Sequence, residues 1–361
     1  MCPDGNGFFK PDVNLDACIG CGLCTDVCYS HADTFNTADS LKAYYGWHKD
    51  HSVLMNSASG GITSAICQAA IHNGFMVIGC TYDNNEKKAK HCIIREIKDI
   101  PKILGSKYFQ SDMSDAVSVL KSLPVDSKIV FFGTPCQILG IKRFLTKSHF
   151  RIKNIYLVEL FCHGIVSPLV WKEYIKLSKV KDVKEVKFRT KHYGWHIPAN
   201  EFVTNRKTIP TKRSGDAFFN AYYSKEFFNK SCYDCEAKKN IGNADLRIGD
   251  YWGNRFIDNK KGVSCIISSS LKGEQLLEEA KAYFELFNGD LKEILGAQSF
   301  DRTHPFDEKQ WNENYEALKD SGIKCSLRHI EKRKPLASRI KRRIYVLLSN
   351  IKNSVTSHLS H

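Results

Sequence analysis

The hydrophobic pattern in the middle of the chain alternates between short apolar runs and helical spacing. The apolar run Lys128–Phe132 leads into a predicted helix from about 138 to 145, and the run Asn154–Phe161 leads into a predicted helix that begins near Pro168. Apolar runs of this length are typical of buried strands. Strands that alternate with helices favour parallel pairing. The pattern therefore predicts an α/β (mixed α+β) fold whose core contains a partly parallel sheet.

Shorter patterns predict further elements on both sides of this core. Apolar residues at helical spacing follow Ser59-Gly60-Gly61, and Ala244–Gly253 has the pattern of a strand that ends at the glycine-flanked Asp250. The other predicted elements are a linker over 33–50, strands over 75–81 and 91–97, a more β-rich part from residue 188, a helix over 271–287 and polar loops after it.

Length and composition are those of an ordinary globular protein. The chain has 361 residues, 42% hydrophobic and 25% charged, enough for a small N-terminal module and a larger core. No run approaches the roughly 18 uncharged apolar residues of a membrane-spanning helix. The N-terminus shows no secretory signal. Fourteen cysteines in such a chain favour metal or redox chemistry in a reducing cytosol over a disulfide framework.

Four cysteines near the N-terminus follow the spacing C-x2-C-x2-C-x3-C. This spacing is that of the run that holds [4Fe–4S] clusters in bacterial ferredoxins. Structural zinc usually takes two C-x2-C pairs set well apart, so zinc and disulfides fit this run less well. We therefore predict an N-terminal [4Fe–4S] cluster on Cys18, Cys21, Cys24 and Cys28.

The sequence does not decide which cysteine is the fourth ligand of this cluster. In two-cluster ferredoxins the fourth cysteine of a run ligates the other cluster, and this sequence has no second complete run. Tyr29 also stands where such runs usually carry proline. Either the module starts upstream of Met1, or a single cluster forms with Cys2 or Cys28 as its fourth ligand.

A second group of cysteines is predicted to meet in the core. Cys136 and Cys162 each follow one of two consecutive predicted strands, so both are expected at the carboxyl-terminal edge of the sheet. Cys232 and Cys235 form a further C-x2-C pair. We predict that the four bind a second [4Fe–4S] cluster. The alternative is that Cys232 and Cys235 form half of a zinc site.

The net charge of +14 is concentrated in the C-terminal tail, where residues 328–361 hold nine Lys or Arg against the single Glu331. This distribution argues against a generally basic, nucleic-acid-binding surface. The body stays attractive to acidic partners such as ferredoxins.

The tail also has apolar residues at helical spacing, which predict a basic amphipathic helix. Such a helix contacts an anionic membrane surface or an acidic partner, or packs on its own domain. The cysteine content and the lack of a secretory signal lead us to expect a cytoplasmic protein. The tail helix leaves peripheral contact at the inner face of the membrane as an open alternative. The apolar stripe comprises Leu336, Ile340, Ile344, Leu347, Leu348 and Ile351, beside Arg339, Lys341, Arg342 and Arg343.

Seven motifs occur in a fixed order between residues 59 and 253. They are Ser59-Gly60-Gly61, Gly105-Ser106-Lys107-Tyr108, Gly133-Thr134-Pro135-Cys136-Gln137, Phe161-Cys162-His163-Gly164, Phe188-Arg189-x-Lys191-x-Tyr193-Gly194-Trp195, Ser231-Cys232-Tyr233-x-Cys235 and Gly249-Asp250-x-Trp252-Gly253. In this order the sequence resembles the beta-subunit family of coenzyme F420 hydrogenases and dehydrogenases, over roughly residues 1–255.

The resemblance implies a flavin-bearing core with a [4Fe–4S] cluster beside it. FAD would convert between the single electrons of the clusters and the two-electron chemistry of a substrate. Because similar proteins do not all use the deazaflavin coenzyme, the substrate stays unassigned. The implied electron partner is a ferredoxin or another electron-transfer protein. The alternative function is a non-enzymatic iron–sulfur relay or sensor subunit that docks to a partner.

The resemblance also implies the cofactor-binding residues. Ser59, Gly60 and Gly61 would offer amides to the FAD pyrophosphate at a helix N-terminus, although without the resemblance an ordinary helix cap is the better explanation of these residues. Lys107, Thr134 and Pro135 would border the flavin ring. The other implied cofactor- or substrate-binding residues are Ser106, Tyr108, Gln137, Arg189, Lys191 and Asp250.

We predict four segments from these features. They are a ferredoxin-type module over 1–40, the two parts of the flavin-binding core over 41–130 and 131–290, and a C-terminal extension with the basic helix over 291–361.

Overall fold

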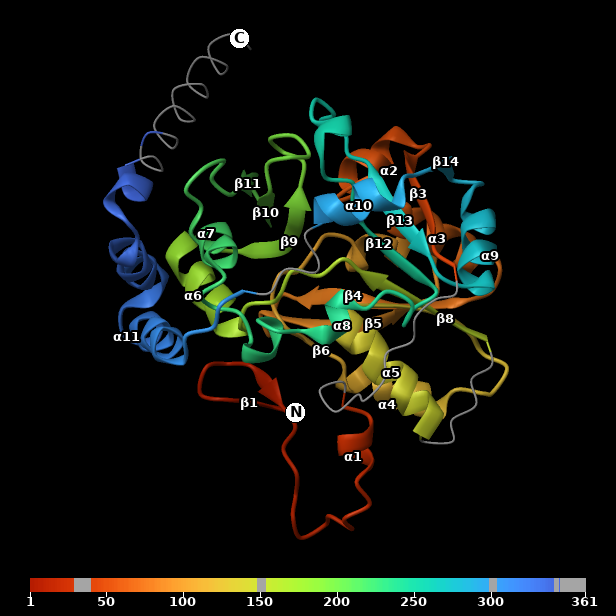
Figure 1. The fold of residues 1–361 in the computed structure, drawn as a ribbon, viewed down its shortest axis with the longest axis horizontal. Coiled ribbons are helices and arrows are strands. Elements are labelled where there is room, and N and C mark those ends of the chain that lie inside the picture. The colour runs from red at the N-terminus through yellow and green to blue at the C-terminus, as the bar shows by residue number, and fades with distance from the viewer. Residues whose placement is uncertain (29–39, 148–153, 299–303, 341–343, 345–361) are drawn as a thin grey trace.

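A mixed nine-stranded sheet forms the centre of the molecule, whose computed structural model describes residues 1–28, 40–147, 154–298, 304–340 and 344 (Figure 1). Its four middle strands are parallel, and antiparallel strands extend it at both sides. In spatial order the strands are β14 (Phe284–Asn288), β3 (Lys42–His48), β13 (Ser264–Ser268), β12 (Leu246–Asp250), β8 (Asn154–Leu160), β7 (Lys128–Gly133), β4 (Met76–Asp83), β5 (Lys88–Ile94) and β6 (Ser111–Asp112).

Helices cover both faces of the large sheet, and successive side chains of its strands pack against one helical layer or the other. In β7, Val130 and Phe132 pack in the core formed with α3 (Ile62–His72) and α9 (Leu271–Ala280), whereas Ile129 and Phe131 pack in the core formed with α4 (Ser114–Ser122) and α5 (Pro135–Lys147). Successive side chains of a strand point to opposite faces. Burial of each such side chain stabilises the fold by about 1.5–3 kcal/mol. With both faces covered, the strand ends are left for polar chemistry.

A third core, rich in aromatic side chains, lies beside the large sheet. The Trp171 ring is fully buried, stacks on Phe109, and donates from Nε1 to the Tyr82 hydroxyl at 2.9 Å. The elements around this core are α6 (Pro168–Ser178), α7 (Ala217–Ser224), α11 (Glu308–Arg333) and the three-stranded antiparallel sheet of β9 (Val183–Thr190), β10 (Ala199–Thr204) and β11 (Thr208–Pro210). The remaining elements are α2 (His51–Asn56), α8 (Glu236–Lys239), α10 (Leu291–Gln298), η2 (Ile97–Ile103), η3 (Lys230–Cys232) and η4 (Asn254–Phe256).

The N-terminal segment is attached to the aromatic core by its first ten residues. Phe8 lies between the strands β1 (Cys2–Pro3) and β2 (Phe9–Lys10), is 2% exposed, and packs against Trp311 and Tyr315. The Gln110 side chain binds both main-chain groups of Phe9, at 2.7 and 3.1 Å. The following loop projects from the body and ends in the short helix α1 (Leu23–Asp26) (Figure 1).

The fold class is as the sequence predicts, but three local predictions are wrong. Residues 42–48 of the predicted linker form β3, an internal strand, because the aromatic residues of this stretch pack on a sheet that pairs with both of its edges. The helix predicted over 271–287 ends at Ala280, and Phe284 starts β14, where it is buried and pairs with β3. The polar loops predicted after residue 287 are instead largely the helices α10 and α11.

The predicted tail helix lies mostly outside the described residues. Residues 336–340 and 344 are helical, and Leu336, Ile340 and Ile344 are all exposed. None of the helices in the described ranges is long and apolar enough to cross a membrane.

Candidate iron–sulfur and cofactor site

Four cysteines from three segments are brought together beyond the carboxyl ends of β7 and β8. Cys136 is in the first turn of α5, and Cys162 follows β8 by two residues. Cys232 ends η3, and Cys235 is the N-cap residue of α8. Burial is the main cause that raises the pKa of Cys232, and the charges of the other three cysteines raise it further. The four cysteine side chains are therefore near neighbours.

In the protein alone, burial disfavours the thiolate form of Cys136, Cys162 and Cys232. Burial raises the pKa of Cys136 to about 12 and that of Cys162 to about 11, and the neighbouring thiols add to both shifts. A bound metal centre requires thiolates and supplies the positive charge that stabilises them. In the described parts of the chain, no three His, Cys, Asp or Glu side chains form a group tight enough for one ion. Four neighbouring thiols of this kind fit a [4Fe–4S] cluster, which takes one thiolate on each iron.

A buried ion pair links the segments that carry two of these cysteines. Arg247 of β12 donates from Nε to Glu159 of β8 at 2.6 Å, three residues before Cys162. Its two Nη atoms donate to the main-chain carbonyls of Lys238 and Asn240, at the end of α8. The guanidinium therefore fixes α8, and with it Cys235, against the end of β8.

A second polar group surrounds Asp250 at the end of β12. The Asp250 carboxylate accepts a hydrogen bond of 2.6 Å from Trp195 Nε1, and its charge acts on both Tyr108 and Arg189. Burial raises the pKa of Tyr108 in spite of the nearby Arg189 guanidinium. Asp250 also acts on His163, the residue after Cys162, so the two groups are neighbours.

Arg189 has the features of a ligand-binding residue. It is 2% exposed, its φ of 55° lies in the left-handed region, and its guanidinium lies over the Trp252 ring. Its Nη2 donates to the Trp195 carbonyl at 2.9 Å and the Tyr108 side chain lies next to the guanidinium, but Nη1 makes no hydrogen bond of good geometry with the described residues. A buried charged donor left unpaired is costly, and an anionic group of a ligand would satisfy it.

Lys191 joins this group to the Ser59-Gly60-Gly61 loop. Its Nζ donates to the carbonyls of Leu54 and Ser59 at 2.5 and 2.6 Å, and burial lowers its pKa to about 7. A Cβ on Gly60 would overlap the Gly46 carbonyl oxygen and the Ser264 amide, and Gly61 has a φ of +88° at the N-cap of α3. Packing against β3 and β13 is therefore sufficient to require these glycines, and a bulky residue at 60 would damage the sheet itself.

The other predicted residues fall into two places. Lys107 is half-buried and donates to the carbonyls of Cys80 and Leu104, both at 2.8 Å, whereas the Ser106 side chain lies next to Tyr108. Gln137 accepts hydrogen bonds from the amide and hydroxyl of Thr134, next to Pro135, and so fixes the turn that carries Cys136.

The N-terminal cysteines lie on the projecting loop. Cys18, Cys21 and Cys24 are exposed, Cys28 is half-buried, and Cys2 is exposed with its sulfur 3.5 Å from the Asp12 carboxylate. The donor set is that of a ferredoxin-type cluster.

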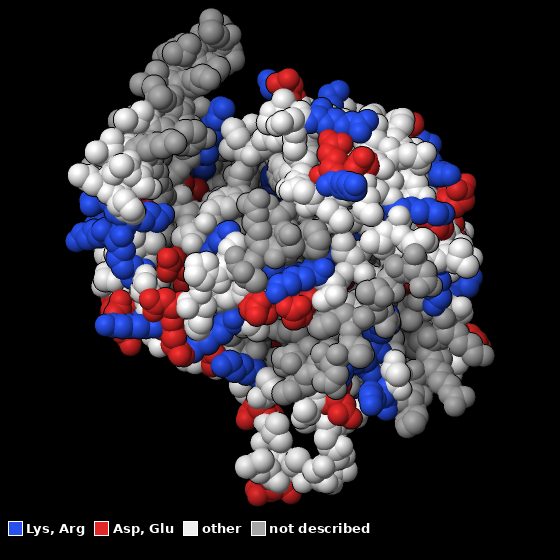
Figure 2. Space-filling model, viewed as in Figure 1, with Lys and Arg blue, Asp and Glu red and all other residues white. Residues whose placement is uncertain are grey.

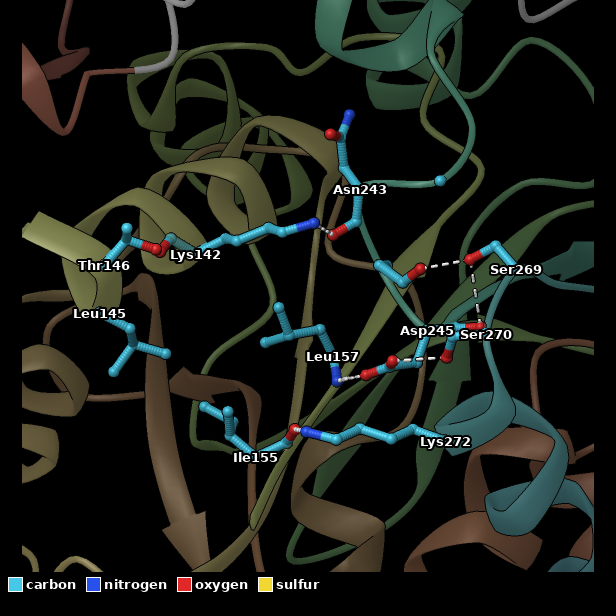
Figure 3. Close-up of a pocket in the computed structure, with 12 residues that line it drawn as sticks. Lys142, Leu145, Thr146, Ile155, Leu157, Asn243, Asp245, Ser269, Ser270 and Lys272 are labelled. Carbon is cyan, nitrogen blue, oxygen red and sulfur yellow. Dashed lines mark hydrogen bonds between the residues drawn. The ribbon is translucent and has the colours of Figure 1, made fainter. Parts of the chain in front are cut away.

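A cavity lies at the other end of the parallel strands. It has a volume of about 370 Å³, and its lining includes Ile155 and the charged residues Lys142, Asp245 and Lys272 (Figure 3). The polar side-chain atoms of these three charged residues bond to main-chain groups or to Ser270. Ile155 is about 17 Å from Leu160 along β8. The cavity is therefore separate from the cysteine group.

Sequence reasoning missed the pair of Arg247 and Glu159. The available signal was a charged residue within each of two otherwise apolar strands, which is rare unless the charges are paired.

Comparison with known proteins agrees with this picture. The family models for the coenzyme F420 hydrogenase/dehydrogenase beta subunit match residues 43–118 with their N-terminal part and 126–290 with their C-terminal part. The chain belongs to this beta-subunit family. A 4Fe–4S binding domain matches residues 11–32. The family resemblance expected from the seven motifs is confirmed.

Two curated relatives are similar over most of this beta-subunit chain. The beta subunit of F420-dependent formate dehydrogenase 1 from Methanococcus maripaludis is 24% identical over 246 residues, 67% of this chain and 60% of its own length. The coenzyme F420-dependent sulfite reductase from Methanocaldococcus jannaschii is 22% identical over 285 residues, 76% of this chain and 44% of its own length. The chain thus spans less than two thirds of either relative.

A solved structure has a similar fold. A chain of the F420-reducing [NiFe] hydrogenase complex from Methanosarcina barkeri aligns with a TM-score of 0.50 and 17% identity, over 82% of this chain and 94% of that one.

Proposed function

We propose that this beta-subunit family member is an iron–sulfur flavoprotein oxidoreductase that passes electrons between [4Fe–4S] clusters and a two-electron substrate through FAD. The observation that carries the proposal is the group of Cys136, Cys162, Cys232 and Cys235 next to the polar group of Arg189 and Asp250. The 4Fe–4S domain match over residues 11–32 supports an iron–sulfur role at the N-terminus as well.

The residues divide into a metal-binding and a cofactor-binding set. The four core cysteines would bind one cluster, and Arg247 keeps the α8 ligand in place. FAD, when bound, supplies the exchange between one-electron and two-electron chemistry. The unpartnered Nη1 of Arg189 would bind an anionic group of FAD or of the substrate, and the Tyr108 ring would line the same site.

Lys191, with a pKa of about 7, is suited to two tasks at this site. When protonated it holds the Ser59 carbonyl, and its charge offsets negative charge beside it. When neutral it can accept a proton near the site. The amides of the Ser59-Gly60-Gly61 loop remain our proposed contact for the pyrophosphate.

The test is an anaerobic cofactor analysis of the full chain after reconstitution with iron, sulfide and FAD. The proposal expects two clusters, hence about eight irons per chain, and about one FAD. Absorption near 450 nm, a rough value for flavins, should bleach when a two-electron donor such as reduced F420 is added. Two clusters without flavin would contradict the flavoprotein proposal and support the alternative function, a non-enzymatic electron relay. Fewer than about four irons per chain would contradict both functions.

We also propose peripheral membrane contact for the tail. The support is the exposure of Leu336, Ile340 and Ile344 on one helical stripe beside basic residues.

A further inference from the structure

Helix α5 contacts both cysteine-bearing parts of the molecule. Its first turn carries Cys136, and it packs against α8, whose N-cap is Cys235. It also packs against α1, which contains Cys24 and ends two residues before Cys28. One helix therefore lies between the core cysteines and the N-terminal cysteine run.

Arg143 and Gly140 of α5 lie against the C-terminal end of α1. The Nε of Arg143 donates to the main-chain carbonyl of Asp26 at 2.6 Å. This carbonyl is at the C-terminal end of α1, where unsatisfied carbonyls carry partial negative charge and favour a cation. A Cβ on Gly140 would lie 3.8 Å from the Val27 carbonyl oxygen, so the backbone preceding Cys28 approaches α5 at a position without a side chain.

These contacts are close to Cys136 along the helix. At 1.5 Å per residue, Gly140 is about 6 Å and Arg143 about 10 Å from Cys136 along the axis. The other end of the N-terminal segment is fixed by Phe8, which is buried in the aromatic core. The cysteine loop is thus held at both of its ends.

Beyond Lys10, which pairs with Asp4, residues 11–22 of this loop are exposed and include no basic residue. Figure 2 shows acidic and uncharged residues on this projection, and Leu15 and Ile19 are more than 80% exposed. Within the described residues, the fixed part of the cysteine run is therefore its α1 end.

We infer that Gly140 and Arg143 are positioning residues that hold the N-terminal cysteine run at one short separation from the core cysteines. The inference rests on the proposed function, since it matters only if both groups of cysteines hold clusters. Electrons would then pass directly between a cluster on the N-terminal cysteines and a cluster on the core cysteines. They would pass beside α5 and not through the projecting tip of the loop.

The test uses the magnetic interaction between two reduced clusters, which depends on their separation and not on turnover. The full chain, reconstituted and fully reduced, is compared by EPR with Arg143→Gln and Gly140→Leu. Lys147→Gln removes the same charge from the exposed last turn of α5, and Gly296→Leu places the same side chain in another helix, at a glycine with open space around it.

The inference expects splitting or broadening of the wild-type spectrum by the interaction. The splitting should be reduced or lost in Arg143→Gln and Gly140→Leu, with unchanged iron content, and kept in both controls. Two clusters per chain without interaction, or with the same interaction in all variants, would overturn the inference and leave the proposed function intact. A chain with a single cluster would overturn both.

Discussion

The guanidinium of Arg247 lies 2.6 Å from the carboxylate of Glu159, and each side chain is only 1% exposed. Buried pairs of this kind gain little net stability, because the loss of hydration offsets most of the attraction. Removal of one partner is different, since it leaves the other charge buried and unpaired.

Arg247→Met should therefore lower the free energy of unfolding by about 3–5 kcal/mol. The double variant Arg247→Met with Glu159→Leu should recover part of this loss, because no unpaired carboxylate remains. Urea denaturation of the cofactor-free chain measures both. Lys281→Met, which breaks an exposed pair with Glu278, should change stability by less than about 1 kcal/mol. Equal effects of Arg247→Met and Lys281→Met would contradict the role given to burial.

Cys232→Ser should lower the iron and sulfide content by about one cluster, roughly four irons per chain. A serine in its place lacks the thiolate that the cluster requires. Iron and acid-labile sulfide assays on the reconstituted chain provide the measurement. Cys325→Ser, at an exposed cysteine of α11, is the control and should keep full iron content. Unchanged iron in Cys232→Ser would rule out the core cluster on these four cysteines.

Arg189→Gln should weaken binding of FAD or of an anionic substrate by about 10-fold to 100-fold, the effect of losing a hydrogen bond from a charged group. Titration with FAD, followed by flavin fluorescence, detects the change. Arg206→Gln, on an exposed turn after β10, should bind as the wild type does. Wild-type affinity for both FAD and substrate in Arg189→Gln would show that its free nitrogen serves no ligand.

The lowered pKa of Lys191 should make the free energy of unfolding increase with pH above about pH 7. Its pKa is about 7 in the folded chain and 10.5 ordinarily, so between these values the unfolded chain binds more protons. The free energy of unfolding then rises with pH over this window through this group. In Lys191→Met that contribution is absent, so the stability of the wild type relative to the variant should increase from pH 7 to about pH 10. Urea denaturation at several pH values checks this, and a constant difference would contradict a lowered pKa.

The tail prediction is tested with liposomes. The full chain should co-sediment with anionic and not with neutral vesicles at low salt, because clustered basic residues each add about 1 kcal/mol near an anionic surface. The control is a chain that ends at Lys334. A chain that ends earlier, at Arg328, would cut α11 and remove the buried Ile330. Equal recovery of both chains in the supernatant would exclude membrane contact.

The parts of the molecule that the sequence predicted well are those with a local signal. The strand–helix repeats around Cys136 and Cys162 are continuous in sequence, and strand direction follows from the crossover, so the edge of the sheet could be named. The aromatic stretch of β3 has no such signal, because its burial comes from pairing with β13 and β14, more than 200 residues away. Long-range pairing of this kind decides strand formation over local polarity.

The same distinction holds within the site. Cysteine spacing predicts metal ligands at the N-terminus, since thiols in such patterns have few other uses, and the 4Fe–4S domain match covers that stretch. The role of Gly60 could not be separated in the same way, because a close approach to a phosphate and a close approach to a neighbouring strand require the same residue. Which N–H groups of the Arg189 guanidinium find hydrogen-bond partners is decided by the tertiary structure, so the sequence could not predict that Nη1 has none.

The burial of Phe8 has a practical consequence for work in air. Iron–sulfur chains are often shortened to remove an oxygen-sensitive cluster, but a chain that began after Cys28 would lose the aromatic ring that covers Trp311 and Tyr315. An air-tolerant version of this protein should therefore be made by replacing the N-terminal cysteines one by one while residues 1–10 are kept.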